Sequence, residues 1–204
     1  MATRKPESSA SSIPASLRTV ISSPRSPALL CELTCCTLPL PTTIVAPSPK
    51  TASWWSRLSR ARSGVGSRRG GLEELEVFLK ETGIAKEDYT FADGSGLSRL
   101  GLVKPEAVVQ LLRKMYASPL RETWVGALPV GGQDGTLEKR FGKDPAAKAI
   151  HAKTGSLTHV NALSGYADSA TYGELAFSIM VNNSSAPAKE VREFIDRIGM
   201  FLLE

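Results

Sequence analysis

Residues 150–158 of this 204-residue chain decide its fold, and they read Ile150-His151-Ala152-Lys153-Thr154-Gly155-Ser156-Leu157-Thr158. On an extended strand, the Lys153 ammonium and the Thr154 hydroxyl can hold a carboxylate, and Gly155 lets another backbone approach closely. The backbone N–H of Ser156 would then be available to a developing oxyanion. The tripeptide Lys-Thr-Gly alone is weak evidence, because it occurs by chance in many proteins and an exposed turn is the ordinary alternative.

The segments around this motif favour an antiparallel sheet. Three short apolar or alternating runs are expected to be strands, namely Ala149–Lys153, Ala162–Ala167 and Leu175–Val181. Parallel pairing would need long crossovers, whereas the connections between these runs are brief. A helix is expected from about Ala188, with its apolar residues at Val191, Phe194, Ile195, Ile198 and Leu202. A sheet followed by a helix that lies across it is an α+β fold.

The residues before the motif predict two more helices. The first has its apolar residues at Leu72, Leu75, Phe78 and Leu79, and Gly83 is a natural stop. The second begins near Pro105, and its apolar face comprises Val108, Val109, Leu112, Met115 and Tyr116. Between them, Tyr89–Phe91 is expected to be a short strand and Asp93–Gly96 a turn. Residues 126–135 are rich in Gly and are expected to form a loop.

The first 70 residues differ in composition from the rest. They carry ten Lys and Arg but two acidic side chains, a net charge of +8, whereas residues 71–204 have a net charge of −3. Ser, Pro and Arg dominate this segment and no window keeps a period of 3.6 or 2. We therefore expect residues 1–63 to be disordered and residues 64–204 to form the folded part. The Arg residues are scattered, which argues against nucleic-acid binding.

The sequence indicates no cofactor, no metal and no membrane anchor. The cysteines are Cys31, Cys35 and Cys36, and no second pair of Cys or His stands at ligand spacing to complete a zinc site. Gly131-Gly132 does not fit a nucleotide-binding pattern. The first residues lack the apolar run of a signal peptide, and Ala28–Leu40 is too short and too interrupted to span a bilayer.

Several polar residues near the motif have structural explanations. His151 and His159 flank the motif, and we expect both to be packing or surface residues. A serine-based site could be imagined around Asp93, Ser95, Ser98 and Arg99. No His stands at a triad-like place, so we expect a structural loop there.

Ordered blocks of sequence surround Ile150–Thr158. They are Asp93-Gly94-Ser95-Gly96-Leu97-Ser98-Arg99, Leu128-Pro129-Val130-Gly131-Gly132, Asp134-Gly135-Thr136-Leu137, Asn161-Ala162-Leu163-Ser164-Gly165-Tyr166, Leu175-Ala176-Phe177-Ser178 and Met180-Val181-Asn182-Asn183. In this order they resemble the C-terminal part of the class C penicillin-binding proteins, which are D-alanyl-D-alanine carboxypeptidases and endopeptidases. The resemblance runs from about Gly64 to the end, and several ordered blocks are far more specific than one tripeptide.

The resemblance implies a fold and a chemistry. The fold would be part of a penicillin-recognising domain of the serine transpeptidase and β-lactamase type, an antiparallel sheet flanked by helices. Members act in the periplasm or cell envelope, cleave D-Ala from peptidoglycan stem peptides ending in D-Ala-D-Ala, and are acylated by β-lactams. A serine attacks the peptide carbonyl with help from a lysine one helical turn later, and a Ser-x-Asn motif helps to move the proton. Lys153, Thr154 and Gly155 match the third motif and would hold the substrate, with the Ser156 N–H as oxyanion donor.

The chain departs from this family in two of its three motifs. No Lys has a Ser three residues before it, and the nearest match is Thr136-Leu137-Glu138-Lys139. No Asn has a Ser two residues before it. The chain therefore offers no candidate nucleophile. Because the resemblance stops where the composition shifts, we hypothesise that residues 1 to about 62 are an out-of-frame or misassembled reading upstream of a genuine family C-terminal part.

Three functional hypotheses follow from these observations. The chain is the substrate-binding part of a serine-type carboxypeptidase, inactive without further sequence. Alternatively, it is a non-catalytic module that still binds peptidoglycan peptides or β-lactams. As a third possibility it is a non-functional truncated product, because half of a sheet-and-helix domain leaves its core open.

Overall fold

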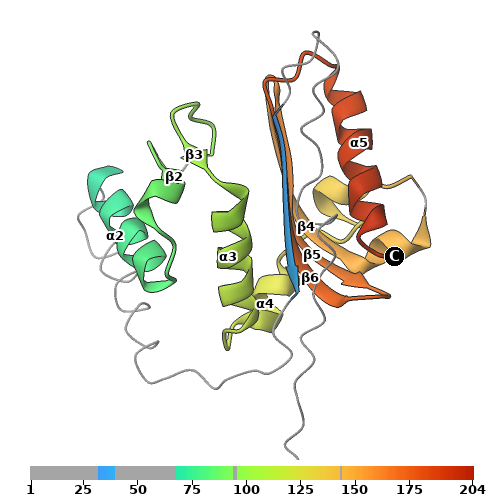
Figure 1. Ribbon diagram of the computed structural model, residues 1–204, viewed down its shortest axis with the longest axis horizontal. Helices are drawn as coiled ribbons and strands as arrows, with labels where there is room; N and C mark the ends of the chain where they lie inside the picture. The colour runs from blue at the N-terminus through green and yellow to red at the C-terminus, as the bar shows by residue number, and fades with distance from the viewer. Residues whose placement is uncertain (1–31, 40–67, 94–95, 143) are drawn as a thin grey trace, which may run out of the picture.

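The computed structural model describes residues 32–39, 68–93, 96–142 and 144–204, and Figure 1 shows their arrangement. The main feature of these residues is a four-stranded sheet with the strand order β1-β6-β5-β4. Its strands are β1 (Glu32–Pro39), β4 (Ile150–Leu157), β5 (Val160–Ser169) and β6 (Gly173–Asn182). Every neighbouring pair is antiparallel, which confirms the expected pairing and makes β4 an edge strand.

Helices cover both faces of this sheet (Figure 1). On one face, residues such as Ile150, Leu163 and Phe177 are fully buried in a cluster with Ile195 of α5 (Ala188–Phe201). On the other face, Tyr166 and Ala176 pack against α3 (Pro105–Tyr116), and α4 (Arg121–Gly126) lies beside it. A strand covered on both faces needs apolar residues on both, which explains the continuous run in β6. The α+β fold with helices flanking an antiparallel sheet is confirmed.

A smaller unit precedes the sheet along the chain. It comprises α2 (Arg68–Glu81), the 3₁₀ turn η3 (Lys86–Asp88) and the two-stranded pair β2 (Tyr89–Thr90) and β3 (Leu102–Val103). Its core consists of Leu79, Ile84, Tyr89 and Ala107, so the beginning of α3 closes this unit while the rest of α3 packs on the sheet. None of the helices in the described ranges is long and apolar enough to cross a bilayer.

Three expectations require correction. A strand was expected over Ala149–Lys153, but Ala149 belongs to the 3₁₀ helix η5 (Pro145–Ala149) and β4 continues to Leu157, so the whole motif lies inside an edge strand. The helix α4 was not expected. Disorder was expected over residues 1–63, but Glu32–Pro39 forms a strand whose backbone pairs with β6. The rest of that segment lies outside the described residues, and a boundary between 63 and 64 stays a prediction.

A loop covers the first half of the outer edge of β4. The Ala152 N–H donates to the Pro129 carbonyl at 2.9 Å, and the Gly131 N–H donates to the Ile150 carbonyl at 2.9 Å. A Cβ on Gly131 would lie 2.2 Å from the Ala147 carbonyl oxygen, so only Gly permits this close approach. The loop then turns into η4 (Gly135–Leu137), and its backbone bonds to β4 end at Ala152.

The register between β4 and β5 depends on Gly165, which stands opposite Ala152. A Cβ on Gly165 would lie 2.1 Å from the His151 carbonyl oxygen and 2.5 Å from the Ala152 Cα. We expect Gly165→Ala to lower the free energy of unfolding by about 1–3 kcal/mol, because backbone atoms must move to admit the methyl group. Urea unfolding followed by circular dichroism measures this change.

The matched control is Gly126→Ala in α4, where an added Cβ meets nothing within 4 Å. We expect that variant to be at least as stable as the parent, because Ala costs less conformational entropy than Gly on folding. Equal unfolding midpoints for the two variants would contradict the close packing of β4 on β5.

Candidate functional site

The Lys153-Thr154-Gly155-Ser156 stretch lies in the extended part of β4, so the exposed-turn alternative is wrong. Backbone groups of an antiparallel edge strand point alternately toward the neighbouring strand and outward. The Ala152 N–H points outward, since it bonds to the loop rather than to β5. Thr154 and Ser156 follow Ala152 at every second position along the strand. Their N–H and C=O groups therefore also face the outer edge, just beyond the place where the loop stops pairing.

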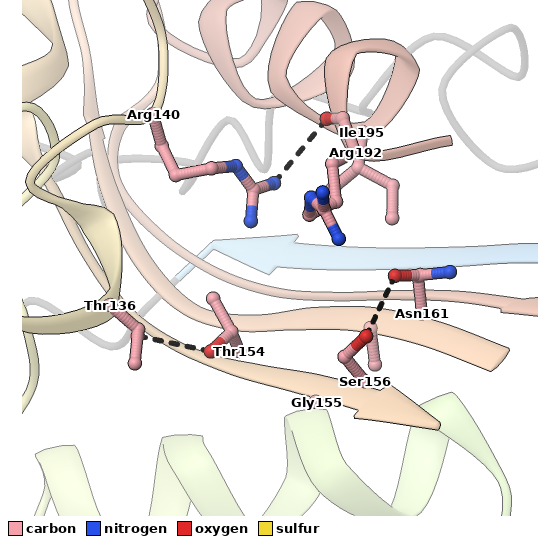
Figure 2. Close-up of a pocket in the computed structure, with 9 residues that line it drawn as sticks. Thr136, Arg140, Thr154, Gly155, Ser156, Asn161, Arg192 and Ile195 are labelled. Carbon is pink, nitrogen blue, oxygen red and sulfur yellow. Dashed lines mark hydrogen bonds between the residues drawn. The ribbon is translucent and has the colours of Figure 1, made fainter. Parts of the chain in front are cut away.

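Side-chain alternation divides the predicted site residues between the two faces of the sheet. Thr154 and Ser156 share a face with Ile150 and Ala152, which is the face covered by α5. They line, with Gly155, a cavity of about 160 Å³. The other lining residues are Thr136, Arg140, Asn161, Ala162, Arg192 and Ile195. Figure 2 shows the hydroxyl side chains on the sheet and the two arginines opposite them.

The hydroxyl groups of this cavity are held by short-range contacts. Thr154 Oγ1 donates to Thr136 Oγ1 at 3.0 Å, and Ser156 Oγ donates to Asn161 Oδ1 at 3.2 Å (Figure 2). Asn161 is almost fully buried and stands opposite Ser156 in the β4–β5 pairing. Because hydroxyls rotate freely about the C–O bond, both can turn their protons toward a ligand.

A largely buried ion pair fixes the wall of the cavity opposite the sheet. Arg140, just after η4, donates from Nε to both oxygens of the Asp196 carboxylate at 2.9 Å, and the two side chains are 12% and 13% exposed. A second nitrogen of Arg140 donates to the Arg192 carbonyl at 3.3 Å. These contacts tie the loop beside β4 to α5, so they set the distance between the helix and the strand.

Lys153 lies on the opposite face of the sheet from Thr154. Its exposed ammonium donates to the Thr154 carbonyl at 2.7 Å. Across the strand pair it stands opposite Ser164, whose hydroxyl bonds to that of Ser178 at 2.9 Å. The structure therefore brings Thr154, Gly155 and Ser156 together at one cavity and leaves the Lys153 side chain outside it.

The other residues singled out in the sequence have local contacts. The Ser98 hydroxyl accepts from the Leu100 N–H at 3.2 Å, and Arg99 donates to the Thr158 carbonyl at 3.2 Å, as expected of a structural loop. Ser95 lies outside the described residues. His159 Nδ1 lies 2.8 Å from the Ser184 carbonyl oxygen. His151 Nδ1 is buried and has no hydrogen-bond partner among the described residues.

Sequence reasoning missed four polar contributors to the cavity, which are Thr136, Arg140, Asn161 and Arg192. Thr136 stands in the Asp134–Leu137 block and Asn161 begins the block after the motif, but nothing in the sequence placed either beside Thr154. Arg192 stands next to Val191 on the edge of the apolar face of a helix, where an exposed position is the ordinary expectation. The contacts that bring these residues together join distant parts of the chain.

Comparison with known proteins identifies a family whose matched range includes the Lys153–Gly155 motif. The D-Ala-D-Ala carboxypeptidase 3 (S13) family matches residues 55–200. The chain belongs to this family. The matched range begins upstream of Gly64, where the resemblance was expected to begin. The family explains why the Lys-Thr-Gly block and the blocks on both sides of it occur together in one order.

Individual relatives match this part of the chain. A D-alanyl-D-alanine carboxypeptidase from Actinomadura sp. (strain R39) is 39% identical over 136 residues, which are 64% of this chain and 25% of that protein. A penicillin-sensitive carboxypeptidase A from Dictyostelium discoideum is 34% identical over 151 residues, which are 71% of this chain and 28% of that protein. The chain thus spans about a quarter of the length of these relatives.

A solved relative confirms the fold. The structure of penicillin binding protein 4 from Haemophilus influenzae superposes with a TM-score of 0.61 at 29% identity, covering 68% of this chain and 32% of that one. The same protein has been solved in complex with a β-lactam. The described residues therefore have the fold of the C-terminal part of a penicillin-binding protein.

The largely buried Arg140–Asp196 pair is expected to stabilise the described part of the chain. Asp196→Asn leaves the Arg140 charge buried without its counter-ion, so we expect a loss of about 3–5 kcal/mol in the free energy of unfolding. Urea unfolding at neutral pH measures it. Glu193→Gln is the control, because its pair with Lys189 is highly exposed and 3.9 Å apart, and we expect a change within about 0.5 kcal/mol. Similar losses in the two variants would contradict this assignment.

Proposed function

We propose that the outer edge of β4 binds the carboxyl end of peptidoglycan stem peptides ending in D-Ala-D-Ala. The observation that carries this proposal is the combination of an open backbone edge and a cavity lined with hydroxyl groups at the same residues, Thr154 to Ser156. An extended peptide can add to such an edge as a further strand through its main chain. Its last carboxylate would then reach the hydroxyls.

Each residue of the motif has a distinct role in this arrangement. The Thr154 and Ser156 hydroxyls donate to the terminal carboxylate, and Gly155 keeps the strand free of a side chain where the peptide passes. The outward N–H of Ser156 donates to the carbonyl oxygen of the peptide bond that the family cleaves. Lys153 lies outside the cavity, and its ammonium bonds to the Thr154 carbonyl at the strand edge and adds positive potential there.

The family resemblance supports a serine-type carboxypeptidase reaction, but this chain lacks its nucleophile. Neither Ser-x-x-Lys nor Ser-x-Asn occurs in the 204 residues. We therefore assign to this chain the substrate-holding part of the reaction, in which the peptide is bound and not cleaved. The cell envelope is the compartment where its ligand occurs. β-lactams, which carry a carboxylate beside an amide carbonyl, are the second expected ligand class.

A binding experiment tests the role of the Thr154 hydroxyl. We expect Thr154→Val to weaken binding of an N-acetylated tripeptide ending in D-Ala-D-Ala about tenfold, because a hydrogen bond to a charged group contributes about 1.5–3 kcal/mol. Isothermal titration calorimetry measures the affinity. Thr90→Val is the control, since Thr90 is an exposed strand residue in β2, outside the cavity. Equal affinities for the two variants would refute the proposed contact.

A fluorescent penicillin tests whether the chain lacks a nucleophile. We expect reversible binding, seen as a rise in fluorescence anisotropy, and no labelled band after denaturing electrophoresis. Penicillin binding protein 4 from Haemophilus influenzae serves as the positive control for covalent labelling. A labelled band for this chain would show that it contains an acylated residue and would overturn the assignment of a non-cleaving role.

A further inference from the structure

The cavity beside Thr154 has a second cationic residue, Arg192, which the sequence did not point to. Arg192 belongs to α5, and its side chain lines the cavity from the side opposite β4. Figure 2 shows its guanidinium extending from the helix toward the sheet, between Arg140 and the Ser156–Asn161 pair. A ligand held by the strand hydroxyls would therefore meet this group.

The charge balance of the cavity leaves Arg192 as its uncompensated cation. Arg140 is neutralised by Asp196, to which it bonds through two nitrogens. Among the described residues, Arg192 makes no ion pair, and no Asp or Glu stands among the residues that line the cavity. The nearest carboxylate one turn along α5 is Asp196, which is already bound to Arg140. The cavity therefore carries a net positive charge.

The positive charge of Arg192 matters for ligand binding because Lys153 does not line the cavity. The Lys153 side chain leaves the strand on the other face, and its ammonium bonds to the outward-facing Thr154 carbonyl at the edge, outside the cavity. Among the residues that line the cavity together with the Thr154 and Ser156 hydroxyls, the cation without a counter-ion is thus Arg192. A guanidinium offers a planar pair of N–H donors that matches the two oxygens of a carboxylate. The cavity, at about 160 Å³, is several times the ~30 Å³ of one water molecule in the liquid, so it has room for a carboxylate with its neighbouring atoms.

We propose that Arg192 is a specificity-determining residue that selects ligands with a free carboxyl end over ligands whose end is amidated or extended. This inference rests on the proposed function, because it concerns the same ligand. The strand edge binds the main chain of the peptide regardless of its last group. The Arg192 guanidinium, acting with the two hydroxyls, binds the negative charge and so separates an acid from its amide.

The test compares one peptide in two forms, an N-acetylated tripeptide ending in D-Ala-D-Ala and its C-terminal amide. Calorimetric titration of the parent chain is expected to show at least a tenfold preference for the acid, as expected for a charged hydrogen bond. Arg192→Gln is expected to reduce that preference to within about threefold by weakening the acid and leaving the amide unchanged. Arg192→Lys, which keeps the charge without the planar fork, is expected to retain part of it.

Arg197→Gln is the matched control, because Arg197 is an exposed residue on the same helix, lies over the Phe194 ring and does not line the cavity. It changes the net charge of the chain equally and is expected to keep the full preference. Thermal melting of each variant shows whether α5 remains packed, and Arg192→Lys provides a folded comparison if Arg192→Gln melts early.

The outcomes separate this inference from the proposed function. If the parent chain binds acid and amide equally, or binds neither, recognition of a carboxyl end by the β4 edge is refuted. If the parent prefers the acid and folded Arg192→Gln keeps the same preference, the β4 edge remains the carboxyl-binding site and the role of Arg192 is refuted. Loss of the preference in Arg192→Gln but not in Arg197→Gln supports both.

Discussion

The candidate site depends on the point at which backbone pairing along the outer edge of β4 stops. Up to Ala152 the strand is paired on both sides, with β5 and with the Pro129–Gly131 loop. From Thr154 onward the same strand remains extended and paired with β5, but the loop has turned away into η4. An edge with outward N–H and C=O groups is a natural place for another chain to bind. The close approach of Gly131 to Ala147, which no larger residue permits, helps to hold this loop where it pairs with β4.

The second constraint is the period of two along a strand, which separates Lys153 from Thr154. Neighbouring residues in an extended chain point to opposite faces, and Lys153 does not line the cavity that Thr154 lines. Thr154 and Ser156 share the face covered by α5, whereas Lys153 shares its face with Ser164. That Lys153 and Thr154 hold one carboxylate together therefore stays a prediction. The hydroxyls face the cavity, and the ammonium bonds to the Thr154 carbonyl at the strand edge.

Local patterns predicted most of the described fold. The three strands from Ile150 to Asn182 and the C-terminal helix follow from short-range periodicity and turn residues, and the order of the blocks indicated the family. Other features depend on contacts between distant residues. Pairing of Glu32–Pro39 with β6, and the cavity between β4 and α5, need the tertiary arrangement. The opposite orientation of Lys153 and Thr154 was available from the strand period. The identity of the face that carries the cavity was not, because it depends on the position of α5.

The two halves of a carboxypeptidase site place different demands on a chain. A nucleophile and its base must stand at fixed spacing on one helix, and this sequence contains neither motif. Substrate binding instead requires an open strand edge, two hydroxyls and a cation at a set distance. All of these are positioned by β4, β5, η4 and α5. The Arg140–Asp196 pair, whose residues are 56 positions apart in the sequence, ties α5 to the loop beside β4. Each of these elements lies within the C-terminal part of the chain. The proposed function therefore treats binding of a carboxyl end and cleavage of the bond beside it as separate properties.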